Sequence, residues 1–220
     1  NGAYTKSITG LNAGSHTLKA VFDTDANYVT SQSSTKTVTV GKQATTLSLT
    51  GQNVTYPNNV ELTGSLSVPN KSVKIYRGDS LVATVTSGSD GSFSRTVSGL
   101  NAGSYTFKAV YEGDSNYIGS NSSNLNITIS KATPTISLTG ENVDYPNDIV
   151  LSGVLSVSNQ SVKIYNGNTL VDTITTGSDG KFTKTISGYS VGSYTFKAVF
   201  EGNTNYNSKT SSNLSITVSK

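Results

Sequence analysis

The chain repeats itself with a period of 89 residues, and this constrains its fold more than any other feature. Residues 43–131 align with residues 132–220 without a gap, and 54 of the 89 aligned pairs are identical. Residues 1–42 align with residues 90–131 at the same offset. Self-similarity at a fixed period indicates repeated structural units. The sequence therefore predicts the C-terminal half of one repeat at 1–42 and complete repeats at 43–131 and 132–220.

Each complete repeat has the pattern of about seven short strands. Apolar residues alternate with polar ones, and Asn, Asp, Gly, Ser and Pro separate the alternating segments, whereas no helical period is present. Seven short alternating strands favour two packed antiparallel sheets. We therefore predict an all-β chain of tandem immunoglobulin-like antiparallel β-sandwich repeats. In the first complete repeat the expected strands are 46–50, 60–68, 73–76, 81–86, 93–97, 105–111 and 125–129.

Several local signals refine this prediction. Gly64 is expected to interrupt the second strand, and Arg77-Gly78-Asp79 to form a tight turn. The stretch Gly88–Gly91 contains Asp-Gly, which accepts positive φ and predicts a hairpin. Strand 105–111 is expected to place four residues on one face, namely Tyr105, Phe107, Ala109 and Tyr111.

The joint between the complete repeats, residues 129–134, is short. It contains Pro134, whose ring fixes its own φ angle and stiffens the chain. Consecutive repeats are therefore expected to stack end to end as a semi-rigid rod.

Composition excludes several classes of protein. Only 13% of residues are charged, the net charge is +3, and no run of Lys or Arg follows a phosphate backbone, so nucleic acid is not an expected partner. The absence of Cys excludes disulfides, zinc–thiolate sites and a Cys nucleophile. No segment approaches the roughly 18 apolar residues of a membrane helix, so no membrane insertion is expected here. Because the chain opens on Asn1-Gly2 without Met, we expect the true N-terminus to lie upstream.

Three stretches carry a resemblance to a known family. The run Gly-Ser-Tyr-Thr-Phe-Lys-Ala-Val-Tyr-Glu-Gly-Asp-Ser-Asn-Tyr at 103–117 resembles bacterial Ig-like repeat domains, as do 177–182 and 216–220. The step Tyr-Pro-Asn-Asp at 145–148 resembles, in particular, adhesin-like surface proteins of methanogenic archaea. The resemblance covers both full repeats and the leading half repeat. It implies an extracellular, cell-surface location and a spacer role.

The same resemblance bears on two tyrosines and the only histidine. Tyr105 and Tyr194 open the strand on which sandwich domains often place a tyrosine corner, and His16 stands at the equivalent position of the half repeat. We interpret His16 as a structural substitution. A catalytic triad or metal cluster that needs His is excluded in the complete repeats.

Acidic loops at 23–27, 112–116 and 201–205 offer closely spaced oxygen ligands of the kind that calcium prefers. The third copy loses the central carboxylate, because Asn203 stands there, and a turn explains the spacing without a metal. Most acids lie in turns, whereas glycoside hydrolysis needs two across a cleft. We therefore predict no metal, no cofactor and no catalytic residues.

Two kinds of covalent modification concern the Lys and Asn residues of the chain. A Lys–Asn isopeptide cross-link needs a buried Lys, but Lys74, Lys163, Lys108 and Lys197 lie out of phase with the apolar face of their strands, so we expect them to face solvent. N-glycosylation sequons are numerous in this Asn-rich, Ser-rich and Thr-rich chain. The candidate glycan sites are Asn53, Asn70, Asn121, Asn126, Asn159 and Asn213.

These observations favour a non-enzymatic stalk of an extracellular adhesin-like surface protein, with neighbouring repeats of the same chain as partners. One alternative is a multivalent module that binds glycans or proteins of a host or partner cell. Another is self-assembly into a surface filament or lattice, because a half sandwich exposes an apolar sheet face and edge strands. Either an upstream segment or another chain would then complete that half.

Overall fold

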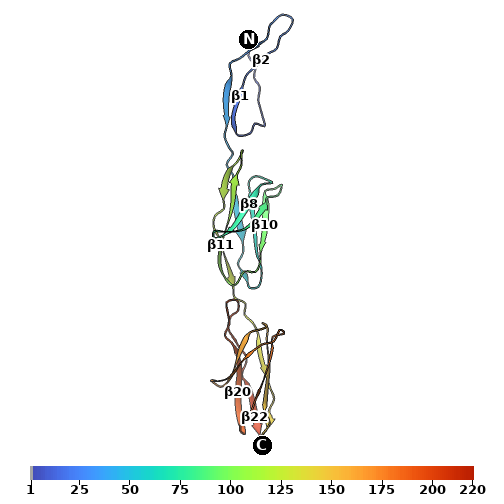
Figure 1. The fold of residues 1–220 in the computed structure, drawn as a ribbon, viewed down its shortest axis with the longest axis vertical. Helices are drawn as coiled ribbons and strands as arrows, with labels where there is room; N and C mark the ends of the chain where they lie inside the picture. The colour runs from blue at the N-terminus through green and yellow to red at the C-terminus, as the bar shows by residue number, and fades with distance from the viewer. Residues whose placement is uncertain (1) are drawn as a thin grey trace. The chain divides into compact units, whose positions relative to one another are not determined.

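A computed structural model describes residues 2–220, and every regular element among them is a β-strand (Figure 1). None of these residues forms a helix long and apolar enough to cross a membrane. Internal contacts divide the chain into two compact units. Loops 53–59 and 98–104 belong to the same unit as the repeat that follows them. The first unit comprises 1–52, 60–97 and 105–127, and the second comprises 53–59, 98–104 and 128–220.

The repeat 43–131 contains two sheets. The smaller has the order β10-β7-β5, with β5 at Leu47–Gly51, β7 at Val60–Leu66 and β10 at Ser92–Val97. The larger has the order β6-β13-β11-β8-β9, and β12 adds to β11. Its strands are β6 (Val54–Thr55), β8 (Ser72–Arg77), β9 (Ser80–Thr86), β11 (Gly103–Gly113), β12 (Ile118–Asn121) and β13 (Leu125–Ser130).

The repeat 132–220 has the same topology. Its smaller sheet has the order β14-β16-β19, and its larger sheet has the order β15-β22-β20-β17-β18 with β21 on β20. The predicted fold class is confirmed: the chain is all-β, with two similar β-sandwich domains. The strands are β14 (Ile136–Thr139), β15 (Val143–Asp144), β16 (Ile149–Leu155), β17 (Ser161–Asn166), β18 (Thr169–Thr175), β19 (Lys181–Ile186), β20 (Gly192–Phe200), β21 (Lys209–Thr210) and β22 (Leu214–Ser219).

All seven expected strands of the repeat 43–131 are present, and two short ones join them. The additional strands are β6 and β12, which are too short for an alternating pattern to show. β6 pairs with β13 in the parallel direction, with Val54 opposite Ile129, so the sandwich is not wholly antiparallel. The equivalent β15 pairs with β22 in the same way.

Gly64 does not interrupt its strand, contrary to the prediction. β7 continues through it, and Gly64 lies opposite Phe93 of β10. A Cβ at Gly64 would meet Phe93 Cζ at 2.2 Å, because the phenyl ring occupies the place of the missing side chain. Gly153 and Phe182 repeat this arrangement at 2.2 Å. The glycine therefore makes room for an aromatic ring across the strand pair.

The hairpin predicted at Gly88–Gly91 is also wrong. The segment forms a turn, since the N–H of Gly91 donates to the carbonyl of Gly88 at 3.0 Å and Gly91 has φ +81°. However, β9 and β10 belong to different sheets, so the turn connects the two layers of the sandwich. By contrast, the tight turn at Arg77–Asp79 does join β8 and β9 as a hairpin.

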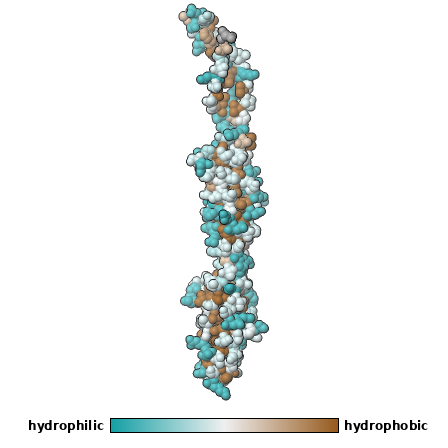
Figure 2. Space-filling view, turned by 180° about the vertical axis from the view of Figure 1, so that it is seen from behind, coloured by the Kyte–Doolittle hydropathy of each residue, from teal (hydrophilic) through white to brown (hydrophobic). Residues whose placement is uncertain are grey.

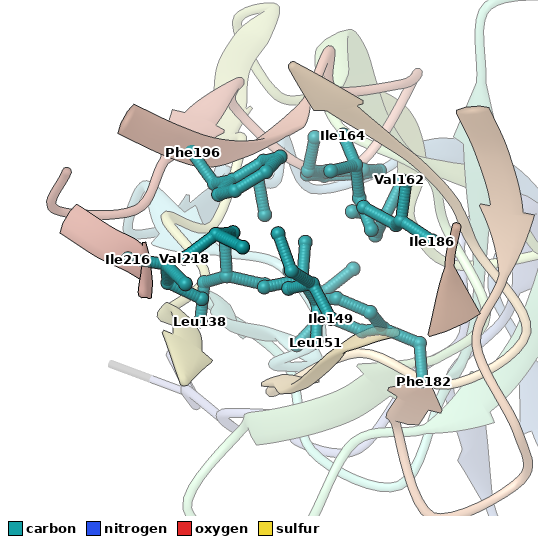
Figure 3. Packing of buried hydrophobic residues seen from close by; sticks show 13 residues of the cluster. Leu138, Ile149, Leu151, Val162, Ile164, Phe182, Ile186, Phe196, Ile216 and Val218 are labelled. Carbon is teal, nitrogen blue, oxygen red and sulfur yellow. The ribbon is translucent and has the colours of Figure 1, made fainter. Parts of the chain in front are cut away.

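The core of the repeat 132–220 lies between its two sheets (Figure 3). Along β20 burial alternates, and the buried positions are Phe196, Ala198 and Phe200. The equivalent strand β11 confirms the face predicted from the sequence, because Phe107, Ala109 and Tyr111 are buried and Tyr105 is half-buried. The core of the repeat 132–220 consists of Leu138, Ile149, Leu151, Leu155, Val162, Ile164, Phe182, Ile186, Phe196, Ala198, Phe200, Ile216 and Val218.

Residues 2–42 form two pairs of strands. β1 (Gly14–Leu18) pairs with β4 (Lys36–Val40), and β2 (Val21–Phe22) pairs with β3 (Ser31–Gln32). Apolar side chains that are buried in the complete repeats are exposed here. For example, Ile8 is 51% exposed, whereas its equivalents Val97 and Ile186 are 7% and 8% exposed. Apolar side chains are therefore exposed in residues 2–42, whereas their equivalents in the complete repeats are buried.

Replacing Phe196 by Ala is expected to destabilise the repeat 132–220 by about 3–5 kcal/mol, because a fully buried ring leaves a cavity. Native-state hydrogen exchange of the β16 and β20 amides measures this locally. Leu170→Ala is the control, since Leu170 is 49% exposed and its loss is expected to change stability by less than about 0.5 kcal/mol. Equal effects of the two substitutions would contradict this account of the core.

Candidate functional site: the Asx loops

Three four-residue loops share one geometry, and we call them the Asx loops: residues 25–28, 114–117 and 203–206. Each has the sequence Asp/Asn-x-Asn-Tyr. The Oδ1 atom of the first residue accepts hydrogen bonds from the third and fourth backbone N–H groups at 2.8–3.0 Å. The N–H of the first residue donates to the carbonyl of the fourth at 3.0 Å. Asp and Asn both supply the required oxygen, so the loop survives their exchange.

Asp114 carries the strongest electrostatic interaction among these loops. Its Oδ2 accepts hydrogen bonds from Lys71 Nζ at 2.7 Å and from the Tyr111 hydroxyl at 3.1 Å. The hydrogen bond from Lys71, together with the one from the Asn116 N–H, lowers the pKa of Asp114 to about 2. The side chains of Lys71 and Asp114 are about one-third exposed, so solvent screens the pair.

The third repeat replaces this ion pair by a neutral one. Asn203 stands at the position of Asp114, and Gln160 stands at the position of Lys71. Asn203 Nδ2 donates to Gln160 Oε1 at 2.9 Å. Both partners differ between the two repeats, and the contact between the loop and the preceding turn is present in each.

In loop 112–116, one of the three considered as calcium sites, the carboxylate oxygens accept hydrogen bonds from protein groups. Both Asp114 oxygens accept hydrogen bonds from the protein, and Glu112 Oε1 accepts one from Lys74 Nζ at 2.6 Å. Within residues 2–220, no group of three or more His, Cys, Asp or Glu side chains converges as a metal site would require.

The linker between repeats is hydrogen-bonded to an Asx loop. In the second unit, the Ala132 N–H donates to the Asn205 carbonyl at 3.0 Å, and the Asn207 N–H donates to the Ala132 carbonyl at 2.8 Å. Lys131 Nζ donates to the Asn203 carbonyl at 2.7 Å. Together with the buried Pro134, these bonds order the linker.

The first linker makes the same bonds within the first unit. The Gln43 N–H donates to the Asn116 carbonyl at 2.9 Å, and the Ile118 N–H donates to the Gln43 carbonyl at 2.9 Å. Lys42 Nζ donates to the Asp114 carbonyl at 2.6 Å. Thr45 replaces the proline there. The linker geometry is therefore kept without a proline, and the hydrogen bonds are shared by both linkers.

A second contact uses the Asn side chain of the Asx loop, and we call it the Asn clamp. In the second unit, Asn205 Oδ1 accepts from the Ala102 N–H at 2.8 Å, and Asn205 Nδ2 donates to Asn101 Oδ1 at 3.0 Å. The donor and the acceptor of one amide are both used, which fixes its orientation. The Tyr206 ring also packs edge-to-face on Tyr56, with centroids 5.4 Å apart.

The first unit contains an equivalent Asn clamp. Asn116 Oδ1 accepts from the Ala13 N–H at 2.9 Å, and Asn116 Nδ2 donates to Asn12 Oδ1 at 3.0 Å. Sequence reasoning missed the clamp. The available signal was twofold. Asn-Ala recurs at 12–13 and 101–102, and an Asn stands at the third position of all three Asx loops.

The predicted tyrosine corner is found at Tyr194, whose hydroxyl donates to the Ser190 carbonyl at 2.8 Å, four residues upstream. His16 Nε2 contacts the Asn12 carbonyl at 2.8 Å over the same four-residue span. The imidazole therefore replaces the phenol in the contact, in agreement with the interpretation of His16 as a structural substitution.

Three of the four lysines named as cross-link candidates contact a carboxylate or a ring. Lys74 Nζ lies 2.6 Å from Glu112 and Lys163 Nζ lies 2.7 Å from Glu201, and these hydrogen bonds raise the pKa of both lysines. Lys197 Nζ lies 5.7 Å from the centroid of the Tyr165 ring. A charged ammonium group is not the nucleophile that an isopeptide bond needs.

The six sequon asparagines are all exposed. Asn70 and Asn159 occupy equivalent turns with φ 54°. Asn53 Oδ1 accepts from the Thr128 N–H at 2.7 Å, and Asn126 Oδ1 accepts from the Thr106 hydroxyl at 2.7 Å. In these two side chains the bonds involve the oxygen and not Nδ2, the atom to which a glycan attaches. On the face shown in Figure 2, hydrophilic and apolar residues are interspersed.

A comparison with known families gives one match, which covers the first complete repeat. Residues 42–130 match the bacterial Ig-like domain (group 3). No curated protein matches the chain. The sequence resemblance is thus confirmed for bacterial Ig-like domains.

Solved structures with a similar fold include several adhesins. A structure concerned with host cell surface retention of a 1.5-MDa bacterial ice-binding adhesin is 12% identical, covers 92% of this chain and 73% of its own, and has a TM-score of 0.35. The adhesin InvE of Yersinia pseudotuberculosis is 15% identical, with coverage of 79% and 58% and a TM-score of 0.36. The I9–I11 tandem of titin is 10% identical, with coverage of 84% and 70% and a TM-score of 0.33. Likeness at these identities concerns the fold alone.

The low pKa of Asp114 predicts a pH dependence that the repeat 132–220 lacks at this loop. A carboxyl whose pKa falls from 3.8 to about 2 on folding stabilises the fold above pH 3.8, and this stabilisation is lost as the pH falls toward 2. The double variant K71Q/D114N, which copies the Gln160–Asn203 pair, is expected to fold and to lose this part of the pH dependence. Thermal unfolding between pH 5 and pH 2 tests it. An unchanged pH profile in the double variant would contradict the assignment.

Proposed function

We propose that the chain is a non-enzymatic structural stalk of an extracellular adhesin-like surface protein, in which Ig-like repeats stack into a semi-rigid rod. The observation that carries the proposal is the recurrence of one joint. The linker bonds and the Asn clamp occur at Asn116 and again at Asn205, an offset of 89 residues, with distances that agree within 0.1 Å.

The energetics of such a joint suit a spacer. Each neutral hydrogen bond contributes only about 0.5–1.5 kcal/mol. However, a linker of few residues keeps the two loops at high effective concentration, so weak contacts suffice to hold them together. The contacts of Asn116 and Asn205 belong to loops with defined internal hydrogen bonds, which limits the entropy lost on docking.

The interactions of the charged side chains support a structural role over a catalytic one. Lys71, Lys74 and Lys163 are paired with carboxylates, and Asp114 orders a loop. The match of residues 42–130 to bacterial Ig-like domains supports a surface location. The closer likeness to adhesin-like proteins of methanogenic archaea, noted at 145–148, is part of this proposal.

A measurement of inter-repeat distance tests the rod. The chain has no Cys, so spin labels on S89C and S178C, at equivalent exposed turns, are unambiguous. Pulsed electron–electron double resonance is expected to give a narrow distribution of distances between the two labels. This distribution is expected to broaden in Asn205→Ala, because both clamp bonds are lost. Asn142→Ala is the matched control, since Asn142 bonds the Thr217 N–H within its own repeat. A broad distribution in the unsubstituted chain would contradict the rod.

We further propose that the exposed sequons carry N-glycans in the native host. Glycopeptide mass spectrometry of the protein isolated from its natural source is expected to find a glycan on at least one of Asn53, Asn70, Asn121, Asn126, Asn159 and Asn213. Unmodified peptides at all six positions would contradict this part of the proposal.

A further inference from the structure

The loop that receives the Asn clamp is not the same in all three copies. Residues 10–14 and 99–103 share the sequence Gly-Leu-Asn-Ala-Gly, whereas residues 188–192 read Gly-Tyr-Ser-Val-Gly. Ser190 and Val191 therefore stand where Asn101 and Ala102 stand in the preceding repeat. The substitutions fall on the two residues that make the clamp bonds.

Resting on the proposed stalk function, we infer that the Asn-Ala dipeptide selects which domain follows. A repeat end that carries Asn-Ala accepts the Asx loop of another repeat of this type. The end that carries Ser190-Val191 does not accept an Asx loop.

The chemistry of the clamp explains the selection. Asn101 presents a carbonyl oxygen two bonds beyond its Cβ atom, and this oxygen accepts from Asn205 Nδ2 at 3.0 Å. A serine hydroxyl oxygen is bonded directly to Cβ and falls short of that position. An Asn amide docked there would lose its acceptor while still being partly removed from water, which is unfavourable. Val191 also adds two methyl groups where Ala102 is half-buried.

The end of the repeat 132–220 has instead acquired contacts within itself. Tyr189, which replaces the Leu100 of the preceding repeat, packs edge-to-face on Tyr194 with centroids 4.5 Å apart and on Phe196 at 5.8 Å. Asn166 Nδ2 donates to the Tyr189 hydroxyl at 3.4 Å. These contacts pack the Tyr189 ring against the core of its own repeat.

Two apolar residues are exposed at this end of the repeat, among polar ones. Val191 is 48% exposed, and Tyr145, the equivalent of Tyr56, is 59% exposed. Tyr56 packs on the Tyr206 ring, so Tyr145 retains one element of the joint while the Asn clamp is lost.

The test extends the chain after Lys220 with a second copy of residues 132–220, which continues the 89-residue period. Spin labels are placed on S178C and on the equivalent serine of the added copy. The added joint is expected to give a broad distance distribution, and S190N/V191A is expected to narrow it to the width of the natural joint. Conversely, N101S/A102V in the 220-residue chain is expected to broaden the distance between S89C and S178C.

The outcomes separate this inference from the stalk proposal. A broad distribution at the natural joint overturns both. If the distance distribution is narrow at the natural joint and equally narrow at the added joint, only the selection by Asn-Ala is overturned. An N101S/A102V chain whose distribution is as narrow as that of the unsubstituted chain also overturns only this selection. Dispersed amide spectra of each variant establish that the repeats remain folded.

Discussion

The hydrogen bonds from backbone N–H groups to one side-chain oxygen, at Asp114 or Asn203, are the interaction on which the joints depend. This oxygen closes the Asx loop and fixes the direction of the Asn side chain two residues later. That Asn then uses both ends of its amide in the clamp, and the loop backbone bonds the linker. A flexible loop would present the same groups at a larger entropic cost.

The sandwich gives these loops a rigid base. In the repeat 132–220 a continuous core joins the two sheets, and Phe196, Ala198 and Phe200 anchor β20, the strand that runs into the third Asx loop (Figure 3). The edge strand β19 carries Lys181 and Lys184, each paired with a carboxylate, which discourages open-ended sheet pairing. The core thus stabilises the repeat, and the Asx loops make the contacts of the joint.

The fold was predictable from the sequence because alternation and turn residues are local signals. The repeat period, the strand faces and the Arg77–Asp79 hairpin were all legible in this way. The errors at Gly64 and Gly88–Gly91 arose because a local pattern does not say which strands pair: Gly64 faces a distant Phe93, and Gly91 joins two sheets. The Asn clamp was missed for the same reason, since its partners lie 103 or 104 residues apart.

The central claim is that successive repeats hold one orientation because of the Asx-loop joint. Residual dipolar couplings in a weakly aligned medium test it directly, since each repeat reports its own alignment tensor. The account predicts tensors of equal magnitude and orientation for 43–131 and 132–220, in a frame common to both repeats. Clearly unequal tensor magnitudes would show that the two repeats reorient independently, and would contradict the claim.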